Sequence, residues 1–237
     1  MRARTCRSTQ IGDDGRVSDP VDLVIFDCDG VLVDSEPISG RVLAAALTAA
    51  GLPTTPAAAR RQYQGLELAD VVARVEARLA GSGGLPDGWL AGFVEDRAAV
   101  FRSELRPVAG VAAAVARVKA AGIRVCVASQ AGPEKMRLTL GLTGLDRLFP
   151  AGSIFSATAV ARGKPFPDLF LHAAATMGVD PGRCVVVEDS PSGVAAALAA
   201  GMRALVYTAD PPGPEPPDPA ARPLASLSEL PALLGIA

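Results

Sequence analysis

The amino-acid sequence predicts an α/β protein in which a parallel sheet carries helices on both faces. Three observations support this fold class. Short apolar runs alternate with Ala-rich segments that have helical periodicity. Several of these segments end in Gly, which is common at the C-terminus of a helix. A long helical stretch without strands interrupts the alternation, so we expect a helical unit inserted into the sheet core.

The apolar runs are short enough to be buried strands, and helical segments lie between them. The predicted strands are residues 23–26, 123–128, 183–187 and 204–207, with a weaker one at 153–156. The predicted helices are at about 111–121, 133–142, 167–177 and 192–200. A helix between two strands returns the chain to the same end of the sheet, so we expect the strands to run parallel.

Residues 36–106 are predicted to form the helical cap, because they carry two apolar stripes at helical spacing and no strand. The stripes are Leu68, Val71, Val72, Val75 and Leu79, and then Leu90, Phe93, Val94, Phe101 and Leu105. A Gly-rich run at 81–84 separates the two stripes.

The rest of the chain divides around this insertion. Residues 21–35 and 107–237 are predicted to form the α/β core. Residues 1–20 are polar and are predicted to be a disordered extension. The Pro-rich segment 211–219 is predicted to be an irregular surface loop, because Pro cannot extend a strand ladder.

Composition argues against several classes of function. The sequence has 23 basic and 25 acidic residues, a net charge of −2, and so no basic excess for nucleic acid. It contains no run of 18 apolar residues, so no membrane-spanning helix is predicted. The four cysteines include no closely spaced pair, and three lie in apolar runs, which is typical of reduced core thiols. We therefore expect a cytoplasmic protein, monomeric or weakly oligomeric, without nucleic-acid or membrane partners.

Polar side chains end three of the predicted strands. Asp27 follows the first strand, Ser129 follows the second, and Glu188 and Asp189 end the third core strand, with Asp29 two residues beyond Asp27. Ligands of open α/β sheets bind outside these carboxyl ends. Crowded carboxylates repel one another unless a cation holds them, and oxygen ligands without His or paired Cys favour Mg²⁺. A metal ion, a hydroxyl group and a lysine together are the groups that enzymes use for phosphoryl transfer.

Four segments together resemble the motifs of the haloacid dehalogenase superfamily. They are Phe-Asp-Cys-Asp-Gly-Val-Leu-Val-Asp-Ser at 26–35, Ser129, Gly-Lys-Pro-Phe-Pro-Asp at 163–168 and Glu-Asp-Ser-Pro-Ser-Gly at 188–193. They occur in the family's order, and the resemblance covers roughly residues 21–208. The helical insertion after the first motif resembles the C1-type cap of the phosphatase and β-phosphoglucomutase branch. The resemblance implies a Rossmann-like parallel sheet core with an inserted helical cap domain.

The resemblance also implies catalytic roles. Asp27 would be the nucleophile that forms an aspartyl-phosphate. Asp29 would be the general acid for the leaving alcohol and then the base for the attacking water. Lys164 would supply a fixed positive charge to the phosphoryl group, which Ser129 and Gln130 would also bind.

The metal implied by the resemblance is Mg²⁺. Its ligands would be Asp27, the backbone carbonyl of Asp29, and Asp189. Glu188 would ligate the ion or orient its waters.

These expectations favour a Mg²⁺-dependent phosphatase acting on a small phosphate monoester, such as a sugar phosphate or a phosphorylated sugar acid. The mutase branch usually has a His at the start of the cap and an Arg shortly after a cap Gly. Here Ser39-Gly40 occupy the first region and no Arg follows Gly65, which puts a β-phosphoglucomutase-like activity in doubt. The loops near Gly65 and Glu67 are expected to set specificity. A non-catalytic binding protein on the same scaffold is the alternative from another class.

Overall fold

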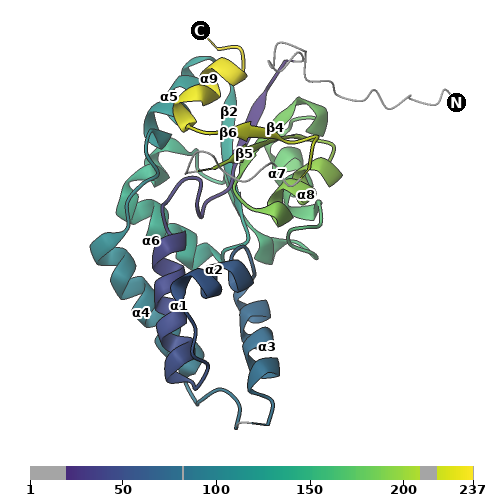
Figure 1. Ribbon diagram of the computed structural model, residues 1–237. Coiled ribbons are helices and arrows are strands. Elements are labelled where there is room, and N and C mark those ends of the chain that lie inside the picture. The colour runs from purple at the N-terminus through teal and green to yellow at the C-terminus, as the bar shows by residue number, and fades with distance from the viewer. Residues whose placement is uncertain (1–19, 82, 209–217, 237) are drawn as a thin grey trace, which may run out of the picture.

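The computed structural model describes residues 20–81, 83–208 and 218–236 (Figure 1). The extension predicted at 1–20 lies outside this range except for residue 20, as does most of the predicted loop at 211–219. The described residues form a parallel sheet with a helical lobe on one side of it (Figure 1).

Within the described ranges the sheet has six strands in the order β3-β2-β1-β4-β5-β6, and every pairing in it is parallel. The strands are β1 (Leu23–Phe26), β2 (Arg124–Ser129), β3 (Ile154–Ser156), β4 (Cys184–Glu188), β5 (Arg203–Tyr207) and β6 (Arg222–Leu224). The α/β class and the five predicted strands are confirmed. The sequence analysis missed β6, a three-residue edge strand whose central residue is Pro223.

Helices cover both faces of the sheet, as predicted. One face packs against α5 (Val111–Ala120), α6 (Pro133–Thr143) and α9 (Leu230–Leu233), and the other against α7 (Asp168–Met177) and α8 (Pro191–Ala199). Short 3₁₀ turns complete the connections, at Leu145–Leu148, Ala157–Ala159, Pro181–Arg183 and Leu227–Glu229.

The core shows why apolar runs form this sheet. Val24 and Phe26 of β1 face one layer, while Leu23 and Ile25 face the other, because side chains alternate along a strand. All four are fully buried, so β1 lies at the centre of the sheet. The thiols of Cys28, Cys126 and Cys184 are buried and free, as expected for core residues.

The described part of the inserted segment forms four helices with a hydrophobic cluster of their own. They are α1 (Glu36–Ala49), α2 (Pro56–Tyr63), α3 (Leu68–Leu79) and α4 (Trp89–Glu104). They lie together beneath the carboxyl ends of the central strands in Figure 1. Trp89 anchors α4 through a hydrogen bond of 3.1 Å from its Nε1 to the carbonyl of Ala46. The boundaries 36–106 stay a prediction. Among the described residues, no helix is long and apolar enough to cross a membrane.

One expectation about this helical unit was wrong. Leu90 and Val94 were predicted to lie on the buried stripe of α4, but they are 40% and 38% exposed, whereas Phe93 and Phe101 are buried. The helix packs on α1 and also contacts α6, while Leu90 and Val94 line an open groove between α4 and α3. Helical spacing identifies the apolar face of a helix, but it does not show how much of that face the neighbouring helices bury.

Candidate active site

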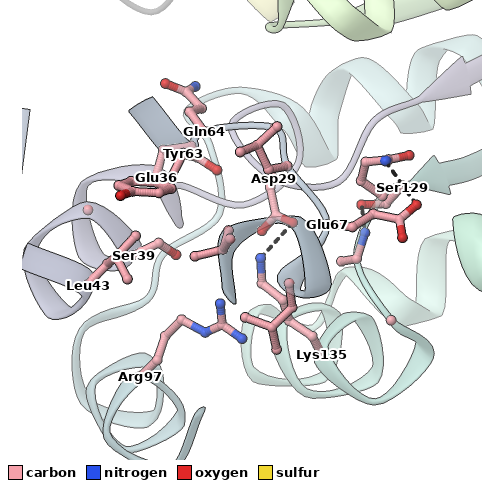
Figure 2. A pocket seen from close by; sticks show the side chains of 18 of the residues that line it. Asp29, Glu36, Ser39, Leu43, Tyr63, Gln64, Glu67, Arg97, Ser129 and Lys135 are labelled. Carbon is pink, nitrogen blue, oxygen red and sulfur yellow. Dashed lines mark hydrogen bonds and ion pairs between the residues drawn. The ribbon is translucent and has the colours of Figure 1, made fainter. Parts of the chain in front are cut away.

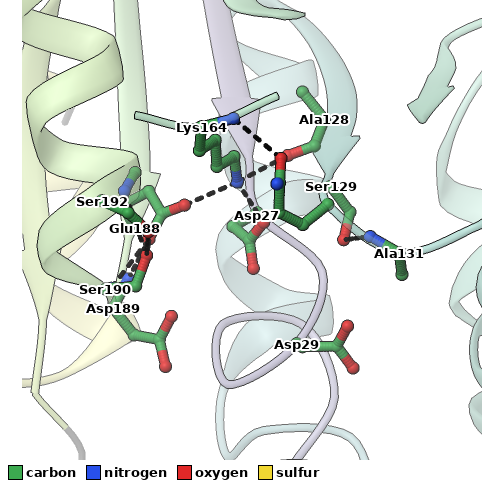
Figure 3. A network of polar contacts seen from close by, with 12 residues as sticks. Asp27, Asp29, Ala128, Ser129, Ala131, Lys164, Glu188, Asp189, Ser190 and Ser192 are labelled. Carbon is green, nitrogen blue, oxygen red and sulfur yellow. Dashed lines mark hydrogen bonds and ion pairs between the residues drawn. The ribbon is translucent and has the colours of Figure 1, made fainter. Parts of the chain in front are cut away.

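The three central strands bring the predicted site residues together. Asp27 directly follows β1, Ser129 ends β2 and Glu188 ends β4, and β1 pairs with both of the other strands. Figure 3 shows these side chains around the carboxyl edge of the sheet. The parallel topology therefore converts positions far apart in the sequence into one cluster, which the sequence analysis expected from the strand ends.

Lys164 lies at the centre of this cluster. It comes from the loop between the Ala157–Ala159 turn and α7, and its side chain is buried. Its Nζ donates to Asp27 Oδ1 at 2.5 Å, to Glu188 Oε1 at 2.6 Å and to the carbonyl of Ala128 at 3.1 Å (Figure 3). Burial alone would lower the pKa of Lys164, but the two carboxylates outweigh it and raise the pKa above its ordinary value. The lysine is therefore a fixed cation.

Asp27 stands in a strongly charged and dry environment. Burial raises its pKa to about 7, Lys164 works against this rise, and the nearby Glu188 and Asp29 add to it. The carboxylate is thus crowded by other anions, and a cation placed beside it would favour its ionised form.

Glu188 uses both of its oxygens within the protein. Oε1 pairs with Lys164, while Oε2 accepts from the backbone N–H groups of Asp189 and Ser190 and from the Ser190 hydroxyl, each at 2.8 Å. Gly193 gives this carboxylate its space, because a Cβ there would collide with it. These contacts make Glu188 a support for Lys164. Its expected role as a metal ligand stays a prediction.

Asp29 has a different environment, two residues further along. Its Oδ1 accepts from the Ser35 hydroxyl at 2.5 Å, and its Oδ2 accepts from Lys135 Nζ at 2.8 Å (Figure 2). Burial would raise the pKa of Asp29, but Lys135 and these hydrogen bonds lower it below its usual value. The sequence analysis missed Lys135. Its signal was scarcity, because the chain has only three lysines and this one opens the helix that follows β2.

Gln130 connects the sheet edge to the helical unit. Its side-chain Oε1 accepts from the backbone N–H of Lys164 at 2.8 Å, and its Nε2 donates to Glu67 Oε1 at 3.1 Å. Glu67 precedes α3 and was expected to influence specificity. Ser129 Oγ accepts from the backbone N–H of Ala131 at 3.1 Å, so its own proton stays available for a ligand.

Asp189 packs against the first turn after β1. A Cβ at Gly30 would collide with its Oδ2, and Gly30 has a φ of +81°, so both the space and the backbone require glycine there. Gln64 of the helical unit donates to Asp189 Oδ2 at 3.1 Å. Burial first, and then Glu188 and Asp27, raise the pKa of Asp189 well above its usual value. These carboxylates repel one another in the metal-free protein.

This donor set fits a hard divalent cation. Asp27 and Asp189 supply carboxylate oxygens directly after the adjacent strands β1 and β4, and the backbone carbonyl of Asp29, two residues beyond Asp27, could be a third oxygen ligand. Among residues 20–81, 83–208 and 218–236, no three acidic, His or Cys side chains form a ready metal cluster by themselves. A backbone ligand and waters would complete the shell, as is usual for Mg²⁺.

A cavity of about 580 Å³ lies between this cluster and the helical unit. Gly65 and Glu67 line it, together with Asp27, Asp29, Ser129, Gln130, Lys164, Glu188 and Asp189. The cavity is also lined by residues that the sequence analysis did not assign to the site: Glu36, Ser39, Arg60, Gln64, Arg97 and Lys135. His172 is exposed on α7 against Phe155 and does not line this cavity.

The parallel sheet, the inserted helices and the buried cluster of Asp27, Lys164 and Glu188 define an α/β protein with a charged site at the carboxyl edge of its sheet. The sequence profile of the haloacid dehalogenase-like hydrolases matches residues 21–201. The chain therefore belongs to the haloacid dehalogenase-like hydrolase family.

Named relatives and a solved structure agree with this family. The chain is 30% identical to 6-phosphogluconate phosphatase of Escherichia coli K12 over 220 residues, 90% of this chain and 94% of that one. It is 34% identical to hexitol phosphatase B of the same bacterium over 186 residues, 78% of this chain and 82% of that one. A hydrolase of the family from Deinococcus radiodurans, solved with phosphate and sodium, superposes with a TM-score of 0.72 at 33% identity, covering 91% and 96%.

The comparisons confirm the resemblance drawn from the four motifs and the prediction that the chain is an enzyme of this class, whose named relatives are phosphatases. The roles of individual residues are not tested by them.

Proposed function

We propose that the chain hydrolyses a small phosphorylated metabolite, in a Mg²⁺-dependent reaction that passes through a phosphorylated Asp27. A sugar phosphate or a phosphorylated sugar acid is the substrate class. The observation that carries this proposal is the buried Lys164, which bridges Asp27 and Glu188 on the floor of a cavity covered by the helical unit. Two named relatives that act on phosphorylated metabolites support the substrate class.

In the first step an Asp27 oxygen attacks phosphorus, and the bond from phosphorus to the substrate oxygen breaks. Lys164 and the Ser129 hydroxyl stabilise the negative charge on the phosphoryl oxygens. Glu188 keeps Lys164 in place, because it forms a second ion pair with Nζ beside the one to Asp27 (Figure 3). Positive charge placed in advance is worth more in this dry site than it would be in water.

Asp29 is the proton carrier of the proposal. Because Ser35 and Lys135 favour its ionised form, it takes the proton of a monoanionic phosphate ester and passes it to the leaving oxygen in the first step. In the second it takes one from the water that attacks the phosphorylated Asp27, and the bond between phosphorus and Asp27 then breaks. Ser35 and Lys135 hold its carboxyl group in the cavity, so Lys135 is a positioning residue in this reaction. Bound Mg²⁺, held by Asp27, Asp189 and the Asp29 carbonyl, would neutralise phosphoryl charge.

The first test is release of inorganic phosphate from a panel of sugar phosphates and phosphorylated sugar acids, with Mg²⁺ and with a chelator. We expect Mg²⁺-dependent turnover that Asp27→Asn abolishes. The exposed Asp34→Asn in the same segment is the matched control and should remain active. Conversion of β-glucose 1-phosphate to glucose 6-phosphate would point to the mutase instead. Binding of esters without turnover of any would point to a non-catalytic protein.

A further inference from the structure

The wall of the cavity opposite the Asp27 cluster carries two polar groups that the proposed chemistry does not use. They are Arg97 of α4 and Ser39 of α1, and both line the cavity. In Figure 2 both side chains point into the same space, on the side of Asp29 away from Ser129. The sequence analysis assigned specificity to the loops near Gly65 and Glu67. It named Ser39 only as a departure from the mutase pattern and did not consider Arg97.

The guanidinium of Arg97 is positioned by an aromatic ring but has no ion-pair partner among the described residues. Its guanidinium lies over the ring of Phe93, one turn earlier on α4, at 4.8 Å from the ring centroid. Among the described residues, no side chain or backbone group forms a hydrogen bond or an ion pair with this guanidinium. Burial lowers its pKa, and the charges of Asp29 and Glu36 oppose that effect. Its donors are thus oriented by a ring and free to meet a ligand.

Ser39 provides an independent observation. Its Oγ is buried, yet it has no hydrogen-bond partner among the described residues. A buried hydroxyl without a partner costs free energy, so such groups commonly have an unseen partner. Ser39 lies one turn after Glu36 on the α1 face that lines the cavity, so the missing partner can come from a molecule bound there.

The charge balance decides which ligand group fits. The cavity is lined by seven carboxylates and four cationic side chains. Lys164 and Lys135 are already paired with Asp27 and Asp29. Glu36 lies beside Arg97, and burial raises its pKa to about 7. A second phosphate, which carries up to two charges, would be repelled more strongly in these acidic surroundings than a singly charged carboxylate. A planar carboxylate also matches the guanidinium fork.

We propose that Arg97 and Ser39 form a carboxylate subsite on the cap, so that the enzyme prefers phosphate monoesters of sugar acids over those of neutral sugars and polyols. This proposal rests on the proposed phosphatase function. It places the phosphoryl group on the sheet side, at Lys164 and Ser129, and the carboxylate on the helical side. The carboxylate accepts hydrogen bonds from the Arg97 guanidinium and from the Ser39 hydroxyl.

The test compares gluconate 6-phosphate with sorbitol 6-phosphate, which differ only in a terminal carboxylate. We expect the wild-type kcat/KM to favour gluconate 6-phosphate. Arg97→Met should lower kcat/KM for gluconate 6-phosphate by about 10- to 100-fold, mainly through KM, since a hydrogen bond to a charged group is lost. The value for sorbitol 6-phosphate should change by less than about threefold, and Ser39→Ala should show the same selectivity with a smaller effect.

Arg102→Met is the matched control, because Arg102 is exposed on the same helix and does not line this cavity. An equal loss for both esters in Arg97→Met, or a wild-type preference for sorbitol 6-phosphate, would overturn the carboxylate subsite. An Arg97-dependent preference for fructose 1,6-bisphosphate over both would show a second-phosphate site instead.

Binding separates this proposal from the proposed function. Calorimetric titration of Asp27→Asn with gluconate 6-phosphate and sorbitol 6-phosphate measures the subsite without turnover. Tighter binding of gluconate 6-phosphate, lost on adding Arg97→Met, supports the subsite even if no ester is hydrolysed. Equal binding of both esters, with p-nitrophenyl phosphate hydrolysed by the wild type, overturns the subsite and leaves the phosphatase intact.

Discussion

Lys164 Nζ lies 2.5 Å from Asp27 Oδ1, although the two residues are 137 positions apart in the sequence. The contact depends on the parallel sheet, because β1 places Asp27 between β2 and β4, and a loop beyond β3 returns Lys164 over the same edge. A nucleophile and its cation are thereby held by the core, and the helical unit supplies the rest of the cavity.

Replacing Lys164 removes the fixed cation of the site. Lys164→Met should lower kcat by about 10²-fold or more, the effect of losing one oriented electrostatic group. It should also destabilise the metal-free protein by about 3 kcal/mol or more, because Asp27 and Glu188 lose their buried partner. Steady-state kinetics and urea unfolding measure the two effects. Lys119→Met, at an exposed lysine on α5, should leave both nearly unchanged. Full activity in Lys164→Met would contradict the assignment.

Gly30 tests whether the position of Asp189 matters for metal binding. Gly30→Ala combines backbone strain at φ +81° with a collision against Asp189 Oδ2. Gly122→Ala carries nearly the same strain at φ +80° and meets nothing within 4 Å, so it is a matched control. Both should lose about 1 kcal/mol of stability from the strain, but only Gly30→Ala should also weaken Mg²⁺ binding and turnover. Equal Mg²⁺ affinity in the two variants, measured by calorimetry, would argue against this role of Asp189.

Gln130 and Glu67 test how the helical unit is held against the core. Glu67→Gln keeps an oxygen that can accept from Gln130, whereas Glu67→Ala removes it. We expect Glu67→Ala to raise KM by about fivefold, the effect of one lost hydrogen bond of about 1 kcal/mol, and Glu67→Gln to stay close to the wild type. Gln130→Ala should be worse than Glu67→Ala, because it also releases the backbone N–H of Lys164. The account fails here if Glu67→Gln and Glu67→Ala behave alike.

Mg²⁺ binding should strengthen as the pH rises through about 7. Burial raises the pKa of Asp27 to about 7, so much of Asp27 holds a proton at pH 6 in the metal-free protein, and burial also raises the pKa of Asp189 well above its usual value. A cation must displace those protons, and its affinity therefore increases with pH. The rise in Tm caused by Mg²⁺ should be larger at pH 8 than at pH 6. An equal rise at both pH values would show that these carboxyl groups are already ionised.

The sequence analysis identified the site residues whose positions are determined by the ends of strands. Asp27, Ser129 and Glu188 come at the ends of apolar runs that were predicted to be buried strands, and parallel pairing brings the ends of such strands to one edge. Lys135 and Arg97 escaped prediction for the opposite reason. They lie on α6 and α4, and the direction in which a helical side chain points depends on how that helix packs against the rest of the protein.

The short strand β6 could not be predicted for a related reason, since it also depends on the assembled fold. β6 has three residues with Pro223 at its centre, so neither its length nor its composition signals a strand. It forms because Leu205, Val206 and Tyr207 of β5 offer an edge for it to pair with. Leu90 and Val94 were wrongly placed in the core, because the part of α4 that is buried depends on how the four helices pack together.

The central claim is that Asp27 accepts the phosphoryl group, and it can be tested by mass spectrometry. Asp29→Asn should slow release of the phosphoryl group from the enzyme, because the base for water is lost, while p-nitrophenyl phosphate needs little help from an acid to leave. After acid quenching with Mg²⁺ present, we expect one phosphoryl group on the peptide that contains Asp27, and none when Asp27→Asn is added. Turnover by Asp27→Asn, or a phosphoryl group on another residue, would contradict the account.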